Sequence, residues 1–204
     1  IRRPRPDDFQ IKEAAEKIKK SKNPIIISGG GVFYSNAMEE LSNFAIKHNI
    51  PVTQTVMGYS TMKRDHSHYA GQIGGLGGKN TNDLAKETDL AIAVGTKLAD
   101  FTTGSWANFE NENFKLISIN VSRFDANKHM AQAVVGDAKV SLTELSRVLG
   151  EWKVRDEWNE KSQKELKIWN EHIDKESAPT NQEIPSYIQV IGAIYRNSDP
   201  NDIA

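Results

Sequence analysis

The sequence predicts an α/β fold, namely a doubly wound parallel sheet of about six strands with helices on both faces. Short apolar runs such as PIIIS from Pro24 and DLAIAV from Asp89 are too short to be helices. They also lack the alternation of a half-buried strand, which indicates strands buried on both faces. Segments with helical spacing lie between these runs. Because strands and helices alternate, we expect parallel pairing through right-handed crossovers.

Each element has its own local signals. Asp7 and Asp8 open a first helix with acids in its first turn, where they favour the helix dipole. Ser35 is placed to cap a helix that runs to His48, and Asp137 is placed to cap another that runs to Leu149. The remaining elements are a short helix over 79–87 and strands at 24–28, 51–56, 89–94, 115–120 and 133–135.

The character of the chain changes after Gly150. Residues 151–183 hold an amphipathic helix and a polar linker, and one helical face has the apolar residues Trp158, Leu166, Trp169 and Ile173. This face packs either on its own domain or on a neighbouring domain or subunit. We expect a central domain over 1–150 and the start of a further domain over 184–204. Since the sequence opens on Ile1, we also expect a piece of a longer chain.

Composition excludes several classes of function. The net charge is -1 and the cations are spread along the chain, so we expect no nucleic-acid partner. Cysteine is absent, which excludes thiol nucleophiles, thiolate metal sites and disulfides and fits a reducing compartment such as the cytoplasm. No apolar run approaches the ~20 residues needed to cross a bilayer, so we expect no membrane partner.

Glycine-rich loops are the candidate binding site. We expect them at the carboxyl ends of strands, where doubly wound sheets bind ligands, and glycine lets a backbone approach a phosphate. The fingerprints of known nucleotide loops are incomplete, because GxGxxG lacks its third glycine after Gly31 and the P-loop pattern has Ile73 and Asn80 at two essential positions. A structural role as tight turns competes with a nucleotide crevice, for which the candidates are Gly29, Gly30, Gly31, Gly71, Gly74, Gly95 and Thr96.

Two polar groupings are weaker candidates. His66 and His68 could present two imidazoles to a metal, but no third ligand is identifiable. Asp100, Arg123 and Asp125 could support acid–base chemistry, but no nucleophile elbow accompanies them. We therefore predict no metal site and no catalytic residues in this chain.

The order of segments resembles the central domain of thiamine-diphosphate-dependent enzymes. The resemblance covers about residues 1–150 and rests on the motifs RRPRPD, NPIIISGGGV, IPVTQTVMG, DHSHYAGQIGGLG, TDLAIAVGTKLADFTTGSW, ISINVSRFDANKH and VVGDAK. The segments DFTTGSW and INVSRFDANKH are most similar to the branch that hydrolyses carbon–carbon bonds in inositol catabolism. Lys97 stands where many members have arginine.

The resemblance implies a three-domain parent enzyme that is a homo-oligomer, with thiamine diphosphate and magnesium bound by the flanking pyrimidine-binding and diphosphate-binding domains. Synthase relatives bind FAD in the central crevice, whereas the hydrolase branch is not expected to need it. Gly136-Asp137-Ala138 with Asn159 imitates the family's metal motif, but Ala138 replaces its glycine, so we interpret Asp137 as a helix cap. The resemblance therefore implies that the fragment alone is inactive.

Overall fold

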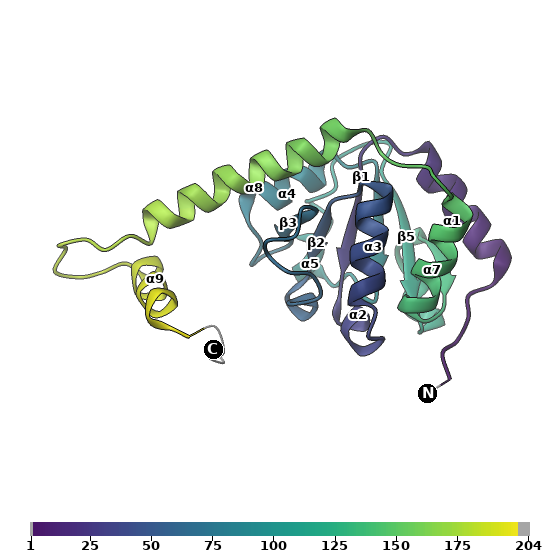
Figure 1. The fold of residues 1–204 in the computed structure, drawn as a ribbon, viewed down its shortest axis with the longest axis horizontal. Coiled ribbons are helices and arrows are strands. Elements are labelled where there is room, and N and C mark those ends of the chain that lie inside the picture. The colour runs from purple at the N-terminus through teal and green to yellow at the C-terminus, as the bar shows by residue number, and fades with distance from the viewer. Residues whose placement is uncertain (1, 200–204) are drawn as a thin grey trace.

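The computed structural model describes residues 2–199 and contains one six-stranded sheet, confirming the predicted fold class (Figure 1). All strands are parallel, and their spatial order is β3-β2-β1-β4-β5-β6. The strands are β1 (Pro24–Ser28), β2 (Val52–Gln54), β3 (Tyr69–Gln72), β4 (Leu90–Val94), β5 (Lys115–Asn120) and β6 (Gln132–Val135). The order reverses between β1 and β4, which creates a crevice at their carboxyl ends.

Nine α-helices and two 3₁₀ turns connect and flank these strands within the described residues. They are α1 (Asp8–Lys20), α2 (Gly30–Tyr34), α3 (Met38–His48), η1 (Val56–Gly58), α4 (Lys79–Glu87), α5 (Asp100–Thr103), α6 (Arg123–Ala126), η2 (Lys128–Met130), α7 (Ala138–Leu149), α8 (Asp156–Glu176) and α9 (Tyr187–Asn197). The cap predicted at Asp137 is confirmed, since its carboxylate accepts from the amide of Val140. The structure also shows that Asp7 caps α1, because its carboxylate accepts from the amide of Phe9.

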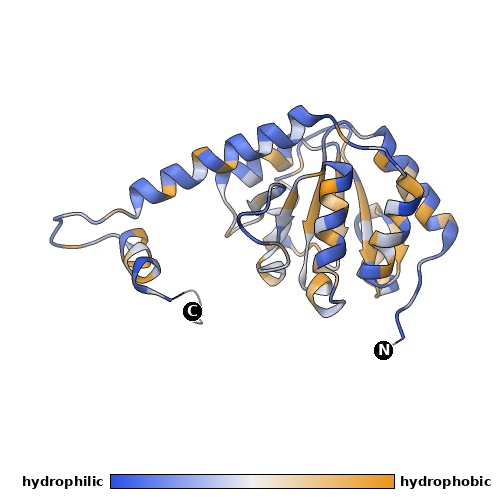
Figure 2. Ribbon diagram, in the orientation of Figure 1, coloured by the Kyte–Doolittle hydropathy of each residue, from blue (hydrophilic) through white to orange (hydrophobic). Residues whose placement is uncertain are grey.

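The centre of the sheet forms the core. Every residue of β1 and β4 is buried, and the two strands pair in register from Pro24 with Leu90 to Ser28 with Val94. The helices α1 and α3 both pack against α7, while α4 packs with α8 beside β3. Figure 2 shows apolar strands enclosed by helices whose outer faces are hydrophilic. This burial on both faces explains why these strands lack hydrophobic alternation.

The tryptophan-bearing helix covers its own domain over its first half. Trp158 is buried, and its indole Nε1 donates to the carbonyl of Pro24 at 2.8 Å, while Leu166 is buried further along α8. Trp169 and Ile173 are only half-buried, and the helix extends beyond the sheet to the region of α9 (Figure 1). The first of the two packing alternatives therefore holds for the amino-terminal half of α8.

Two details differ from the sequence prediction. The strand β3 was not predicted, because it is short, contains Gly71 and follows a polar segment. The helix predicted from Ser35 to His48 is present but begins later, at Met38, because Asn36 has a left-handed φ of 49° that interrupts the helical backbone between α2 and α3. Ser35 therefore caps nothing at the start of α3, and its hydroxyl instead donates to Asp137 at 2.9 Å.

Candidate functional site: the crevice at the switch point

A large cavity lies at the carboxyl ends of the strands, where the strand order reverses. Its volume is about 790 Å³. It is lined by the α2 turn, the loops after β2, β4 and β5, and the start of α7, and apolar side chains such as Met57, Phe101 and Ile119 form much of its wall. A cavity of this size and place is typical of a small-molecule or cofactor site in an α/β sheet.

The glycine turn at this crevice is held by its own backbone bonds. The amide of Gly29 donates to the carbonyl of Val94 and the amide of Gly31 to the carbonyl of Gly95, both at 2.9 Å. A Cβ on Gly29 would lie 2.5 Å from the Gly95 oxygen, and one on Gly31 would lie 2.6 Å from the Gly95 Cα. These two glycines thus let α2 pack directly on the loop after β4, and their amides do not form a phosphate cradle.

The seven glycine-loop candidates do not all reach this crevice. Gly30, Gly31, Gly95 and Thr96 line it, whereas Gly29 lies behind the turn. Gly71 lies inside β3 rather than in a loop, which corrects its predicted place, and it faces a different cavity. Gly74 has a φ of 101° and packs against the backbone of Phe101 and Thr102. The seven candidates therefore do not form one site: four line the crevice, one lines another cavity, and two are packing positions.

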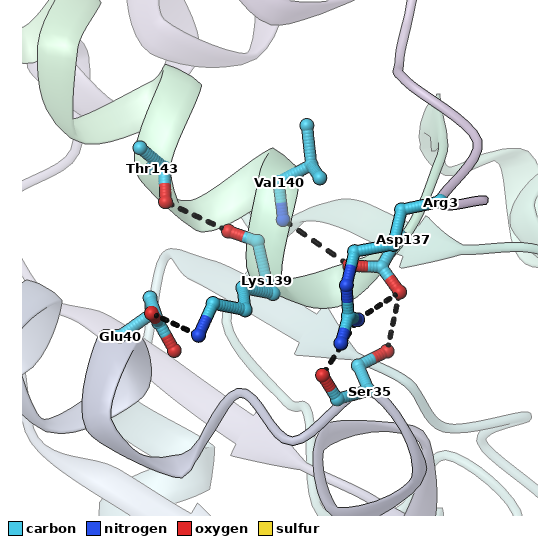
Figure 3. A network of polar contacts seen from close by, with 7 residues as sticks. All are labelled: Arg3, Ser35, Glu40, Asp137, Lys139, Val140 and Thr143. Carbon is cyan, nitrogen blue, oxygen red and sulfur yellow. Dashed lines mark hydrogen bonds and ion pairs between the residues drawn. The ribbon is translucent and has the colours of Figure 1, made fainter. Parts of the chain in front are cut away.

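A polar network at the edge of the crevice was missed by sequence reasoning (Figure 3). The Nη1 of Arg3 donates to the carbonyl of Ser35 at 2.6 Å and to Oδ2 of Asp137 at 2.9 Å, and the Asp137 amide donates to the carbonyl of Pro4. These bonds hold the amino-terminal segment across the start of α7. Since Arg3 and Asp137 are 134 residues apart in sequence, no local pattern indicates their pairing.

The network engages the carboxylate of Asp137 with three partners. Its carboxylate caps α7 and also accepts from Arg3 and from the hydroxyl of Ser35. Nearby, Lys139 of α7 forms an ion pair with Glu40 of α3 at 2.8 Å, which joins the two helices (Figure 3). Asn159 donates to the carbonyl of Ser67 from α8. The motif Gly136-Asp137-Ala138 is therefore a capping motif, as interpreted from sequence.

The three acid–base candidates do not form one interacting group in the structure. Asp125 lines the crevice, and a hydrogen bond from Lys128 at 2.8 Å holds the pKa of its carboxyl below the usual value. Asp100 is the first residue of α5, and Arg123 opens α6. Within residues 2–199 no hydrogen bond or ion pair joins Asp100 to Arg123. Asp125 is thus held as a carboxylate and lacks the raised pKa of a general acid.

The two histidines form a structural cluster beside α3. His66 pairs with the hydroxyl of Ser42 at 2.8 Å and accepts from the amide of His68, while His68 pairs with Oδ1 of Asn49 at 3.0 Å. Burial lowers the pKa of both imidazoles, to about 4 for His68, where the neighbouring His66 contributes as well.

The described part of the chain holds no group of three residues of the metal-binding types. Nor does any helix there combine the length and apolarity needed to cross a membrane.

Comparison with protein families now identifies the fold's relatives. Residues 11–145, from α1 to the middle of α7, match the model of the thiamine pyrophosphate enzyme central domain. The chain belongs to this family. The match includes the glycine turn, the crevice loops and all six strands, so the crevice is a feature of the central domain.

Curated relatives place this central domain within much longer proteins. It is 39% identical over 175 residues to a 3D-(3,5/4)-trihydroxycyclohexane-1,2-dione hydrolase of Clostridium perfringens, which covers 86% of this chain and 27% of the relative. It is 43% identical over 145 residues to the protein of that name from Bacillus cereus, which covers 71% of this chain and 22% of the relative. The chain thus spans about a quarter of the length of these relatives.

Proposed function

We propose that this chain is the noncatalytic central domain of a thiamine-diphosphate-dependent enzyme that opens the ring of trihydroxycyclohexane-1,2-dione. The product would be a deoxy-glucuronic acid, formed in inositol degradation. The observation that supports this proposal is the identity of about 40% with hydrolases of that name, over a stretch that includes the crevice and α8 in the Clostridium perfringens relative. The chain would supply subunit and domain contacts rather than reacting groups.

The residues of this chain do not fit a site for thiamine diphosphate and magnesium. The described residues include no cluster of three carboxylates or imidazoles, and Asp137 is engaged by Arg3 and Ser35. We propose that flanking pyrimidine-binding and diphosphate-binding domains hold both groups, in an assembly of at least two subunits. The cofactor supplies an electron sink for cleavage beside a carbonyl. The isolated chain would then be inactive.

A flavin is not required by this reaction. Adding water across a carbon–carbon bond of a cyclic dione transfers no net electrons, and the amides of Gly29 and Gly31 are engaged by the backbone. The alternative functions are the FAD-binding domain of an acetolactate-synthase-like enzyme and a free-standing nucleotide-binding module. The volume of the crevice, about 790 Å³, supports these alternatives because it could accept part of a nucleotide.

A chimera tests the proposal. The segment of the Clostridium perfringens hydrolase that matches this chain would be replaced by the chain, and the purified chimera would be assayed for water-dependent opening of the dione. We expect activity within about tenfold of the unmodified hydrolase, since the domain contributes no reacting group. Formation of acetolactate from pyruvate, or a folded chimera without dione hydrolysis, would contradict the proposal.

Ligand binding to the isolated chain separates the flavin alternatives. A ligand that binds only the folded state raises its stability, so FAD and ADP would be titrated while thermal unfolding is followed. We expect no flavin absorbance and no rise in the unfolding midpoint with either ligand. A clear rise with FAD or ADP would favour the synthase-like domain or the nucleotide-binding module.

A further inference from the structure

A second cavity lies on the other side of the loop that joins β3 to α4, at the outer edge of β3. It has a volume of about 230 Å³ and is enclosed by the loop after η1, by β3, by the start of α4 and by the middle of α8. Unlike the crevice, it is lined mainly by polar groups, among them Tyr59, Arg64, Tyr69, Asn80, Trp169 and Asn170. It shares no lining residue with the crevice.

A buried amide oxygen in this cavity lacks a partner among the described residues. Asn80 is 7% exposed and its Nδ2 donates to the carbonyl of Ala70 at 3.1 Å, but its Oδ1 has no hydrogen-bond partner among residues 2–199. A Cβ built on Gly78 would lie 2.4 Å from this Oδ1 and 2.8 Å from Nε1 of Trp169. The amide oxygen and the indole N–H therefore approach the same side of Gly78. Because the orphan atom is an acceptor, it favours a ligand that donates, such as a hydroxyl group.

The same cavity has an unpaired cation and an uncapped helix start. Arg64 is exposed and has no ion pair with any carboxylate in the described part of the chain. Gly78, the N-cap of α4, has no side chain to bond the first amides of that helix. Burial raises the pKa of Tyr69, so its hydroxyl remains a donor. The guanidinium of Arg64, the first backbone amides of α4 and the hydroxyl of Tyr69 are all donors, and together they favour a carboxylate as the ligand.

From this arrangement we infer that the cavity between β3, α4 and α8 binds a small hydroxycarboxylate, such as a sugar acid. Its carboxylate would lie toward Arg64 and the first turn of α4, and a hydroxyl would donate to Oδ1 of Asn80. The ring of Trp169 offers an apolar surface for the carbon chain. The volume is below the roughly 300–1,000 Å³ of drug-sized sites, which limits the ligand to a small molecule. This inference does not depend on the proposed function.

Calorimetric titration of the 204-residue chain with three six-carbon probes tests the inference. D-gluconate has both carboxylate and hydroxyl groups, hexanoate has only the carboxylate, and sorbitol has only hydroxyls. We expect saturable binding of gluconate with a Kd of ~1 mM, at least ~10-fold tighter than either control probe. Equal binding of gluconate and hexanoate, or no saturable binding of gluconate, would overturn the inference.

Variants locate the binding. Arg64→Gln should weaken gluconate binding at least ~10-fold because it removes the charge-assisted bond. Trp169→Phe should weaken it less, because Phe keeps an aromatic face and loses the five-membered ring with its N–H. Lys63→Gln is the matched control, since Lys63 is an exposed neighbouring cation that does not line the cavity. The affinity of the Lys63→Gln variant for gluconate should equal that of the original chain. An R64Q variant with the affinity of the original chain would overturn the inference even if gluconate binds.

Discussion

At the residue scale, the glycine turn shows how a single missing side chain determines local packing. The α2 turn and the loop after β4 approach so closely that a Cβ on either Gly31 or Gly95 would lie 2.6 Å from the Cα of the other. The backbone amides of Gly29 and Gly31 could have faced a phosphate, but they donate instead to carbonyls of β4 and of the loop after it. The turn is therefore required by the fold, whether or not a ligand enters the crevice.

Gly31→Ala should destabilise the chain by ~2–3 kcal/mol, because its Cβ would lie 2.6 Å from backbone that cannot move independently. Urea unfolding followed by circular dichroism measures this difference. Gly75→Ala is the matched control, because its Cβ would meet only the ring of Phe101, at 3.2 Å, and the expected change is below ~1 kcal/mol. Equal stability of G31A and the original chain would contradict a packing role.

His68 should make stability depend on pH. Its pKa falls from 6.5 to about 4 on folding, because burial and the neighbouring His66 disfavour the imidazolium. Well above pH 6.5 the imidazole is neutral in both states. As the pH falls from 6.5 toward 4, the unfolded chain takes up a proton that the folded chain does not. This site therefore lowers the free energy of unfolding by up to ~3 kcal/mol across that window.

Urea unfolding at about pH 7 and about pH 5 measures this loss. His68→Gln should reduce it, while the smaller contributions of His48 and His66, whose pKa values burial also lowers, would remain. A pH dependence that is the same in H68Q as in the original chain would contradict the assignment.

At the element scale, α8 has two halves with different roles. Its first half contributes Trp158, Ser162 and Leu166 to the core beside α4 and β3, whereas the exposed Ile168 and the half-buried Ile173 follow in the second half. The first half of α8 is therefore packed on the domain, and its second half is largely exposed. Helical periodicity predicted the apolar face correctly, but it could not show that only the first half is covered.

Trp158→Ala should destabilise the chain by ~3–5 kcal/mol, because it opens a cavity and removes the bond from Nε1 to Pro24. Ile168→Ala on the same helix should change stability by less than ~0.5 kcal/mol, since Ile168 is 51% exposed. Both values come from urea unfolding. A small effect of W158A would show that the first half of α8 is not anchored as described.

At the scale of the whole molecule, α9 lies apart from the sheet (Figure 1). It begins with a capping box at Ser186 and Gln189, and it contacts the end of α8 through Gly192 and Arg196, which meet the carbonyl of Ser177. Its apolar side chains remain exposed, among them Tyr187 at 92%, Ile191 at 64% and Tyr195 at 74%. The helix is therefore held by few contacts with the rest of the domain.

A chain that ends at Glu183 should keep the free energy of unfolding of the original within ~0.5 kcal/mol, because α9 buries little. A chain that ends at Arg155 should be much less stable, since it also loses Trp158 and the rest of α8. Urea unfolding of both shortened chains measures the difference. A large loss from the first truncation would show that α9 belongs to the cooperative unit.

Local patterns in the sequence determined the α/β class, five of the six strands, the cap at Asp137 and the resemblance to the family, because strand burial, helical period and capping act over a few residues. Only the tertiary structure decided the rest. β3 depends on its partner β2 and on cover from α4 and α8. The Arg3–Asp137 pair, the division of the glycines between two cavities, and the orphaned Oδ1 of Asn80 all depend on residues that are distant in sequence and meet only after the sheet has formed.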